Sequence, residues 1–336
     1  MNAGAARGLT QEQRKRFHDL GYLLVEDLIE PFVLDSVQDE ITAQIDRLAS
    51  GLVEERKLSS SYSELPFTSR LAYITRECPD VVNRITDGAL SLPAMFDLIR
   101  YEPLLDVAES LCGAELIASS VYRLRPKLPN YGPGVVPWHQ DSAYFEPYCD
   151  KSLILTCWVP FVDANALNGC LQVLERGHLG PVVPHGPGPN HYLEISHENL
   201  PNGEVVTVPA RRGSVLLMTN RTPHCSTPNT TDTIRWSMDL RYQSASLPTN
   251  AHITRLRQEP RLPEGAPAAC YPPEADVLIR SSRRPQQVVR TAEEFERIRQ
   301  SHIPGDITER WGNPSFWKAD GRRRLGHALA EKAATG

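Results

Sequence analysis

The sequence lacks the features that mark membrane-spanning, secreted and nucleic-acid-binding proteins. Its longest strongly apolar segment, Leu153–Val162, has about half the length that a membrane span needs. The first residues contain no apolar core of the kind found in signal peptides. The formal net charge is -5, and no stretch combines dense lysine and arginine with aromatic residues. Duplex nucleic acid and anionic membranes are therefore poor candidate partners.

Paired cysteines are missing as well. The seven cysteines are scattered, and no two of them form a CxxC motif. An odd number of isolated thiols is typical of a reducing compartment. Taken with the absent signal and span, this cysteine pattern leads us to expect a cytoplasmic protein.

What the sequence does contain indicates a folded chain with helices in its first third. Apolar residues make up 40% of 336 residues, which is enough for a sizeable core, and we expect a single domain over 1–336. Thr10 and Gln13 form a capping-box pattern before a first helix, and Tyr22–Glu26 fits a short strand. A second helix should begin at Pro31, and a third should cover Pro103–Gly113. We expect residues 1–114 to be mainly helical.

The pattern changes after Gly113 to short β-prone runs separated by proline, glycine and asparagine. The expected strands are Leu116–Arg125, Pro137–Phe145, Leu153–Val162, Cys170–Leu174, Glu204–Val208, Ser214–Thr219 and Thr233–Tyr242. Many short strands without intervening helices favour an antiparallel barrel or sandwich. We therefore expect an all-β core over 115–243, followed by an irregular extension over 244–336.

The segment WHQDSAYF raises the possibility of a metal site. If it is a strand, His139 and Asp141 point to one face and can reach a common point, as two metal ligands must. A histidine two residues before an acid should nevertheless occur about once by chance in a chain with 10 histidines and 41 acids. The pair needs support from elsewhere in the sequence.

That support comes from the segment around His224, which lies in a turn-like sequence just after a predicted strand. The next strand alternates cleanly, with Arg235 on its polar face. Two histidines and a carboxylate form the facial triad of non-haem iron(II) oxygenases, although a zinc hydrolase could use the same ligands. Arg235 favours the oxygenase, because a 2-oxoglutarate-dependent enzyme needs a cation for the distal carboxylate of that cosubstrate.

At these residues the sequence resembles the phytanoyl-CoA dioxygenase family of iron(II)/2-oxoglutarate oxygenases. The similar segments are WHQD, LTCWVPFVDANALNGCLQVLERGHLG, GSVLLMTNRTPHCS and TIRWSMDLRY. The resemblance implies a double-stranded β-helix of the jelly-roll type, so that the chain is α+β overall. It also implies that His139, Asp141 and His224 bind Fe(II).

The same resemblance implies a cosubstrate site in which Arg235 binds 2-oxoglutarate, with Ser226 and Trp158 beside it. Arg125 stands where the family often has a lysine. The expected reaction uses O2 and 2-oxoglutarate, hydroxylates a C–H bond and releases succinate and CO2. Tyr144, Phe145 and Arg241 are candidate walls of the substrate pocket.

The sequence does not name the substrate, and we expect a small molecule, such as a natural-product intermediate, bound by a monomer or homodimer. Two alternatives remain open at this point. One is a metal-dependent hydrolase on the same triad, and the other is a jelly-roll protein that binds a ligand without turning it over.

Overall fold

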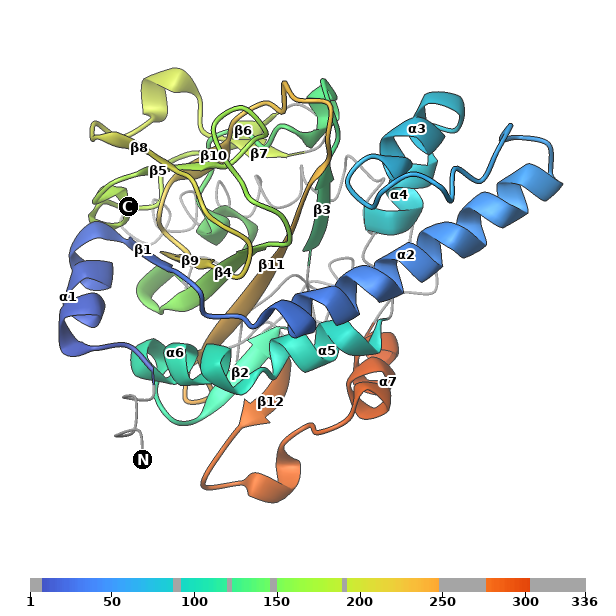
Figure 1. Ribbon diagram of the computed structural model, residues 1–336. Coiled ribbons are helices and arrows are strands. Elements are labelled where there is room, and N and C mark those ends of the chain that lie inside the picture. The colour runs from blue at the N-terminus through green and yellow to red at the C-terminus, as the bar shows by residue number, and fades with distance from the viewer. Residues whose placement is uncertain are drawn as a thin grey trace, which may run out of the picture.

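The β-core consists of facing antiparallel sheets (Figure 1) in the computed structural model, which describes residues 8–86, 92–119, 123–145, 150–188, 192–247 and 276–302. The larger sheet has the order β1 (Tyr22–Val25), β9 (Val215–Thr219), β4 (Ile154–Pro160), β11 (Arg235–Ser244), β2 (Leu116–Ser119) and β12 (Asp276–Arg280). Strand β3 (Arg123–Lys127) also pairs with β11. The smaller sheet has the order β10 (His224–Ser226), β5 (Leu171–Leu174) and β8 (Val205–Val208). The predicted jelly-roll core is confirmed.

Strand β11 has two chemically different faces, as its alternation predicts. Its apolar side chains join the main hydrophobic core, and these are Trp236, Met238, Leu240 and Tyr242. The other face points between the sheets and carries Arg235, Ser237, Asp239 and Arg241, all of them buried. Strand β4 divides in the same way, because Leu155, Cys157 and Val159 join the main core whereas Trp158 belongs to a separate inner cluster.

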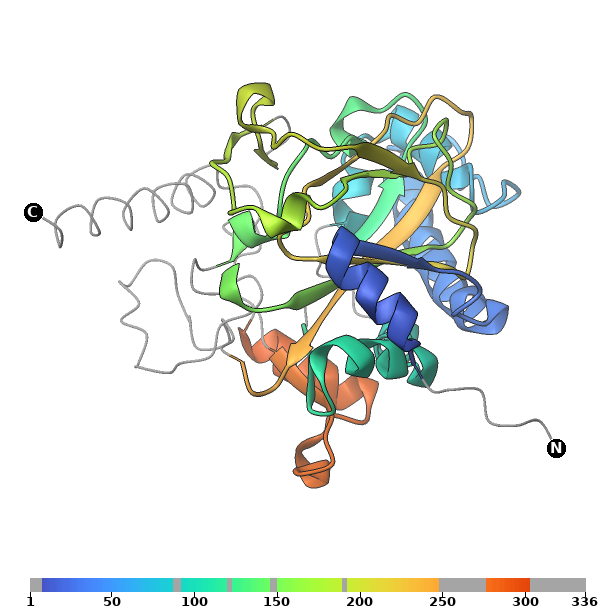
Figure 2. The ribbon, with the colours of Figure 1, turned by 90° about the vertical axis from the view of Figure 1, so that its left-hand side faces the viewer.

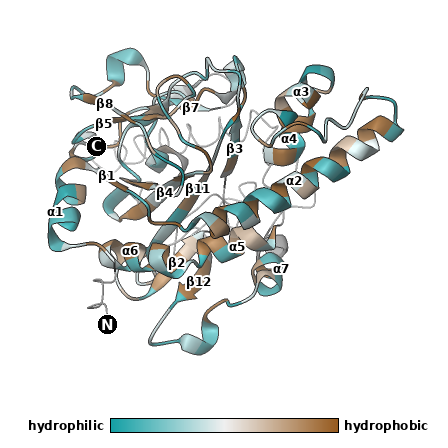
Figure 3. Cartoon of the chain, viewed as in Figure 1, coloured by the Kyte–Doolittle hydropathy of each residue, from teal (hydrophilic) through white to brown (hydrophobic). Residues whose placement is uncertain are grey.

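Helices cover the outer face of the larger sheet (Figures 1 and 2). They are α1 (Gln11–Leu20), α2 (Pro31–Glu54), α3 (Arg70–Glu77), α4 (Val81–Thr86), α5 (Pro93–Ile99) and α6 (Glu102–Cys112). Apolar residues recur along α2 at steps of three and four, and the ribbon alternates between hydrophobic and hydrophilic (Figure 3). Leu34, Val37, Ile41 and Ile45 are almost fully buried, so this helix anchors the helical layer on the core.

The start of the chain follows the predicted signals closely. Thr10 caps α1 through its side chain, and Gln13 completes the capping box. Gly21 ends the helix at φ 87°, a left-handed conformation that glycine adopts without strain. A Cβ at this position would lie 2.3 Å from Nδ1 of His178. Glycine is thus required here by both backbone and packing.

Several predicted strand boundaries are wrong around the candidate site. Pro137–Phe145 is not a strand: His139 forms an isolated bridge, and Asp141–Tyr144 is a 3-10 helix, η2. The amide of Ser142 donates to the carbonyl of Asn220 at 2.8 Å, which turns the chain out of the extended conformation. His224 in turn lies inside strand β10 and not in a turn.

The C-terminal extension was predicted to be irregular, but its described part is ordered. Strand β12 pairs with β2 at the edge of the larger sheet, and α7 (Ala292–His302) packs near α5. Arg280 of β12 forms ion pairs with Glu102, Asp106 and Glu109 of α6. These contacts attach the extension to the core.

A small hairpin and several short turns lie outside the two main sheets. Strands β6 (Gly186–Pro187) and β7 (Leu193–Glu194) form a small hairpin. Short 3-10 turns occur at η1 (Gly132–Gly134), η4 (Gly177–Leu179), η6 (His197–Asn199) and η7 (Pro285–Gln287). Among the helices that the structure describes, none is both long and apolar enough to cross a membrane.

We predict that Tyr242→Phe lowers the free energy of unfolding by about 1–2 kcal/mol, because a buried carbonyl then loses its partner. The Tyr242 hydroxyl donates to the carbonyl of Ile99 at 2.6 Å, which ties β11 to the end of α5. Urea denaturation of both proteins measures the difference. Tyr73→Phe is the control, since Tyr73 is 37% exposed, and an equal loss in both variants would contradict the assignment.

Candidate metal and cosubstrate site

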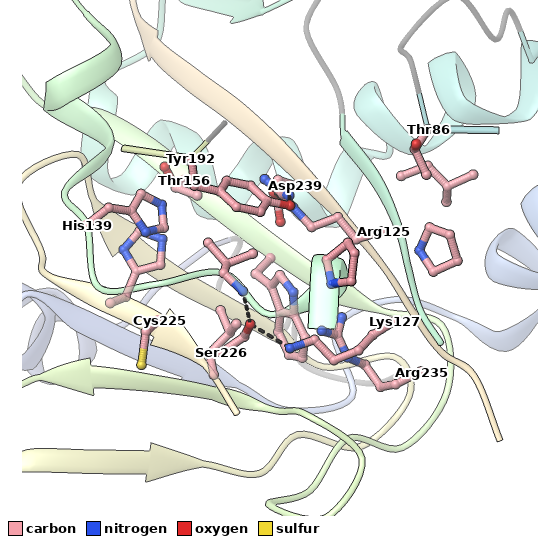
Figure 4. A pocket seen from close by; sticks show the side chains of 18 of the residues that line it. Thr86, Arg125, Lys127, His139, Thr156, Tyr192, Cys225, Ser226, Arg235 and Asp239 are labelled. Carbon is pink, nitrogen blue, oxygen red and sulfur yellow. Dashed lines mark hydrogen bonds and ion pairs between the residues drawn. The ribbon is translucent and has the colours of Figure 1, made fainter. Parts of the chain in front are cut away.

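A pocket of about 480 Å³ lies between the two sheets. Strands β3, β4, β9 and β11 of the larger sheet contribute to its wall, and β5 and β10 of the smaller sheet face them. Helix α4 and Tyr192 border it farther out. Figure 4 shows His139 at one side of the pocket and Lys127 with Arg235 at the other. The pocket therefore joins the predicted metal ligands to the predicted cosubstrate cation.

The two histidines are brought together by the backbone. The amide of His139 donates to the carbonyl of His224 at 3.0 Å, and the amide of His224 donates back at 2.9 Å. This bridge places their imidazole rings 4.2 Å apart, centre to centre. Asp141 supplies the third group, and one ligand atom from each of the three residues lies within 4.8 Å of the others. The structure thus assembles the triad that the sequence predicted.

The ring nitrogens are arranged for metal binding. Nδ1 of His139 lies 2.9 Å from the carbonyl of Pro137, and Nδ1 of His224 lies 2.9 Å from the carbonyl of Thr222. A carbonyl only accepts, so each Nδ1 carries the hydrogen and each Nε2 keeps its lone pair. Burial lowers the pKa of His224 to about 4, so its ring is neutral at pH 7. This donor set fits a divalent metal with open positions.

Asp141 is held from one side. Its Oδ2 accepts from the hydroxyl of Thr156 at 2.6 Å and from Arg241 at 3.0 Å. Its Oδ1 lies 3.6 Å from Nε2 of His139. Burial alone would raise the pKa of the Asp141 carboxyl, but the Arg241 guanidinium beside it outweighs burial, and the pKa lies well below its usual value. The Asp141 carboxylate is therefore ionised in the metal-free protein.

The cation end of the pocket is built around Arg235, which is 2% exposed. One of its terminal nitrogens donates to Ser237, while its Nε has no hydrogen-bond partner among the described residues. The guanidinium lies 5.2 Å from the ring centre of Trp158, whose indole nitrogen donates to the Ser237 hydroxyl at 3.1 Å. Trp158 is therefore both buried core and a pocket wall that orients Arg235.

Lys127 lines the pocket beside Arg235, and the sequence did not identify it as a candidate site residue. Its Nζ donates to the hydroxyl of Ser226 (Figure 4) and to the carbonyl of Thr227, both at 2.6 Å. Lys127 lies directly opposite Arg235 in the pairing of β3 with β11. Arg125, which stands where the family often has a lysine, instead pairs with Asp239 at 2.5 Å. Alternate residues of a strand point to the same face, so the alternation that includes Arg125 also predicts Lys127 on the pocket side.

Ser226 is positioned to donate a hydrogen bond into the pocket. Its oxygen accepts from Lys127 and from the amide of Val136 at 3.0 Å. Those two bonds use both lone pairs, so the hydroxyl hydrogen is left for another acceptor. Gly169 makes room for this arrangement, since a Cβ there would lie 2.2 Å from the Lys127 side chain. Arg235, Lys127 and Ser226 together form a donor surface suited to an anion.

The predicted substrate-wall residues have different surroundings. Arg241 lines the pocket, although its guanidinium also contacts Asp141. Phe145 is 4% exposed, lies 5.9 Å from the Arg241 guanidinium and is not among the described residues that line the pocket. The side chain of Tyr144 lies outside the described part of the chain. Their substrate roles stay predictions.

Comparison with known proteins gives the family. A family model described as phytanoyl-CoA dioxygenase (PhyH) matches residues 17–237. The chain belongs to the phytanoyl-CoA dioxygenase family. This match begins within α1, covers the other helices before the core and ends just after Arg235.

Individual relatives of this family are distant. A probable phytanoyl-CoA dioxygenase of Caenorhabditis elegans is 25% identical over 185 residues, which cover 53% of this chain and 55% of that protein. The human peroxisomal phytanoyl-CoA dioxygenase is 25% identical over 181 residues, covering 53% of this chain and 50% of the relative. The chain thus spans about half the length of the curated relatives that it matches.

A solved structure shares the fold along nearly the whole chain. The apo form of ThoJ, described as a non-heme monooxygenase, superimposes with a TM-score of 0.57 at 16% identity, covering 94% of this chain and 99% of ThoJ. At this identity the likeness concerns the fold. It agrees with two facing sheets covered by helices.

We predict that His139→Ala and His224→Ala abolish high-affinity Mn(II) binding, since each removes one of three ligands. Isothermal titration of metal-free protein with MnCl2 measures the dissociation constant. His197→Ala is the matched control, because His197 is exposed on η6 and is not one of the three triad residues. Retention of wild-type affinity in either triad variant would contradict the assignment.

Proposed function

We propose that the protein is an Fe(II)- and 2-oxoglutarate-dependent dioxygenase that hydroxylates a C–H bond of a small organic substrate. One observation carries this proposal: Arg235 is a buried cation whose Nε has no hydrogen-bond partner among the described residues, and it lies in the same pocket as three candidate metal ligands. Burying a charge is costly unless a partner compensates it. A dianionic cosubstrate that reaches from the metal to Arg235 supplies that partner.

His139, Asp141 and His224 would hold Fe(II) on one face, leaving the opposite positions for cosubstrate and O2. Iron bound there with 2-oxoglutarate and O2 supplies the oxidative decarboxylation that yields succinate and CO2 and the oxidising power for hydroxylation. The protein contributes binding, orientation and exclusion of water. A carboxylate as the third ligand supports hydroxylation over halogenation.

Arg235, Lys127 and Ser226 bind the distal carboxylate of 2-oxoglutarate. The guanidinium offers Nε and a second nitrogen in one plane, which suits a two-pronged contact with a carboxylate. Trp158 and Ser237 restrain the guanidinium, so little rotational freedom is lost on binding. These contacts fix how far the cosubstrate reaches toward the triad.

The substrate enters the part of the pocket that the triad and the cosubstrate cations leave open. Arg125, Asp239, Tyr192 and Thr86 border that part (Figure 4). A pocket of about 480 Å³ lies within the range for small-molecule ligands. We propose a small natural-product intermediate as the substrate, turned over in the cytoplasm by a monomer or homodimer.

The function is tested by incubating the protein with Fe(II), 2-oxoglutarate and air in the absence of substrate. We expect slow formation of succinate, which enzymatic or chromatographic assay detects, and faster formation with an accepted substrate. No succinate from metal-loaded protein in any substrate screen would refute the proposal. Turnover with zinc under anaerobic conditions would instead indicate a hydrolase, and ligand binding without turnover would indicate a binding protein.

We predict that Arg235→Met weakens 2-oxoglutarate binding by about 10- to 100-fold while Mn(II) affinity is kept. A hydrogen bond to a charged group contributes about 1.5–3 kcal/mol, and 1.4 kcal/mol corresponds to tenfold in affinity. Titration of Mn(II)-loaded protein with 2-oxoglutarate measures the change. Arg211→Met is the control, because the Arg211 side chain is 61% exposed and pairs with surface acids. Unchanged affinity for 2-oxoglutarate in the Arg235 variant would show that Arg235 does not bind the cosubstrate.

We predict that 2-oxoglutarate binds more weakly as the pH rises above 6. Burial, together with Arg235 and Arg125, lowers the pKa of Lys127 to about 6, so its amine is largely neutral in the empty pocket at pH 8. The dianion favours the protonated amine and raises its pKa, and binding therefore takes up a proton. Affinity should fall by up to about tenfold per pH unit between the two pKa values.

Calorimetry of Mn(II)-loaded protein between pH 6.5 and 8.5, in buffers of different ionisation enthalpy, measures both affinity and proton uptake. Lys127→Met should bind weakly at every pH and take up no proton at this site. If the wild type and this variant show the same pH profile, another group is responsible.

A further inference from the structure

Two side chains from neighbouring strands converge on one oxygen of Asp141. Thr156 of β4 and Arg241 of β11 are direct partners in the pairing of these strands, so both point into the pocket. Thr156 donates to Oδ2 at 2.6 Å, and Arg241 donates to the same oxygen from its terminal nitrogen at 3.0 Å and from Nε at 3.3 Å. Oδ2 of Asp141 therefore accepts hydrogen bonds from both strands.

The other oxygen faces the triad. Oδ1 lies 3.6 Å from Nε2 of His139, and the three candidate ligand atoms lie within 4.8 Å of one another. We propose that Arg241 and Thr156 are positioning residues that hold Oδ2 of Asp141 away from the metal, so that Asp141 binds it through Oδ1 alone. This inference rests on the metal site of the proposed function.

A single bond from Asp141 keeps a coordination position open. A carboxylate can bind a metal through one oxygen or two, and a second bond would take a position that 2-oxoglutarate or O2 needs. Asp141 starts the short helix η2, which does not by itself orient the carboxylate. The rigid sheet does so instead, because β4 and β11 present the two donors at a fixed separation.

Direct repulsion of the metal and positioning of Asp141 predict opposite results when Arg241 is removed. Arg241 is 5% exposed and close to the metal position, so its charge alone repels a divalent cation. If repulsion of the metal were its only effect, Arg241→Met would tighten metal binding. If Arg241 positions Asp141, the same variant weakens metal binding although a repelling charge has gone.

The experiment measures Mn(II) affinity of metal-free protein by calorimetry, without cosubstrate or turnover. We expect Arg241→Met to weaken Mn(II) binding about 10- to 100-fold, which is the usual effect of removing a partner of a metal ligand. Thr156→Val removes one hydrogen bond and leaves the charge unchanged, and we expect weakening of about fivefold or more. Arg125→Met is the matched control: it removes a cation from the same pocket but not from Asp141.

The possible outcomes separate the two proposals. The positioning role is overturned if folded Arg241→Met or Thr156→Val binds Mn(II) as tightly as the wild type or more tightly. It is also overturned if Arg125→Met weakens Mn(II) binding to the same extent. Loss of a buried ion-pair partner is strongly destabilising, so circular dichroism checks folding, and Thr156→Val decides the question if Arg241→Met does not fold. If the wild type itself fails to bind Mn(II), the metal site of the proposed function is wrong.

Discussion

Strand β11 has to bury charged side chains on one face and large apolar side chains on the other, and the rest of the structure depends on this requirement. The apolar face is covered by the helical layer, to which Trp236 and Tyr242 are joined through carbonyls of Phe67 and Ile99. The charged face cannot be packed against helices without compensation. It therefore lies between the two sheets, where other polar groups meet it.

The buried charges of β11 have different partners along the strand, and these partners divide the pocket into a metal end and an anion end. Arg241 meets Asp141 at the metal end, and Asp239 meets Arg125 in the middle. Arg235 keeps an Nε without a hydrogen-bond partner among the described residues, and the amine of Lys127 lies beside it. The site consequently offers a carboxylate and two imidazoles where a metal ion would bind, and a guanidinium and an amine where a carboxylate would bind. A chelating dianion bridges the two ends.

The smaller sheet supplies the complementary half of this arrangement. Strand β10 carries both His224 and Ser226, so one three-residue segment contributes to the metal end and to the anion end. Its backbone also holds His139 in place through a pair of hydrogen bonds. The distance between the two ends of the pocket is therefore set by the sheet framework, which loops could not define as firmly. Both sheets must be present before either half of the site exists.

The sequence alone determined the facing-sheet core and the apolar and polar faces of β11, and it predicted His139, Asp141, His224 and Arg235 as site residues. The two faces follow from local periodicity, because side-chain direction alternates along a strand. The four residues follow from motif order and from the family resemblance, which a linear reading retains. Tertiary structure decided the rest. It bent the chain after His139, brought Lys127 rather than Arg125 to Ser226, and placed Arg241 against Asp141. Each of these contacts joins residues about 80 to 100 positions apart. Such partners are chosen by sheet pairing and burial, and no local pattern encodes them.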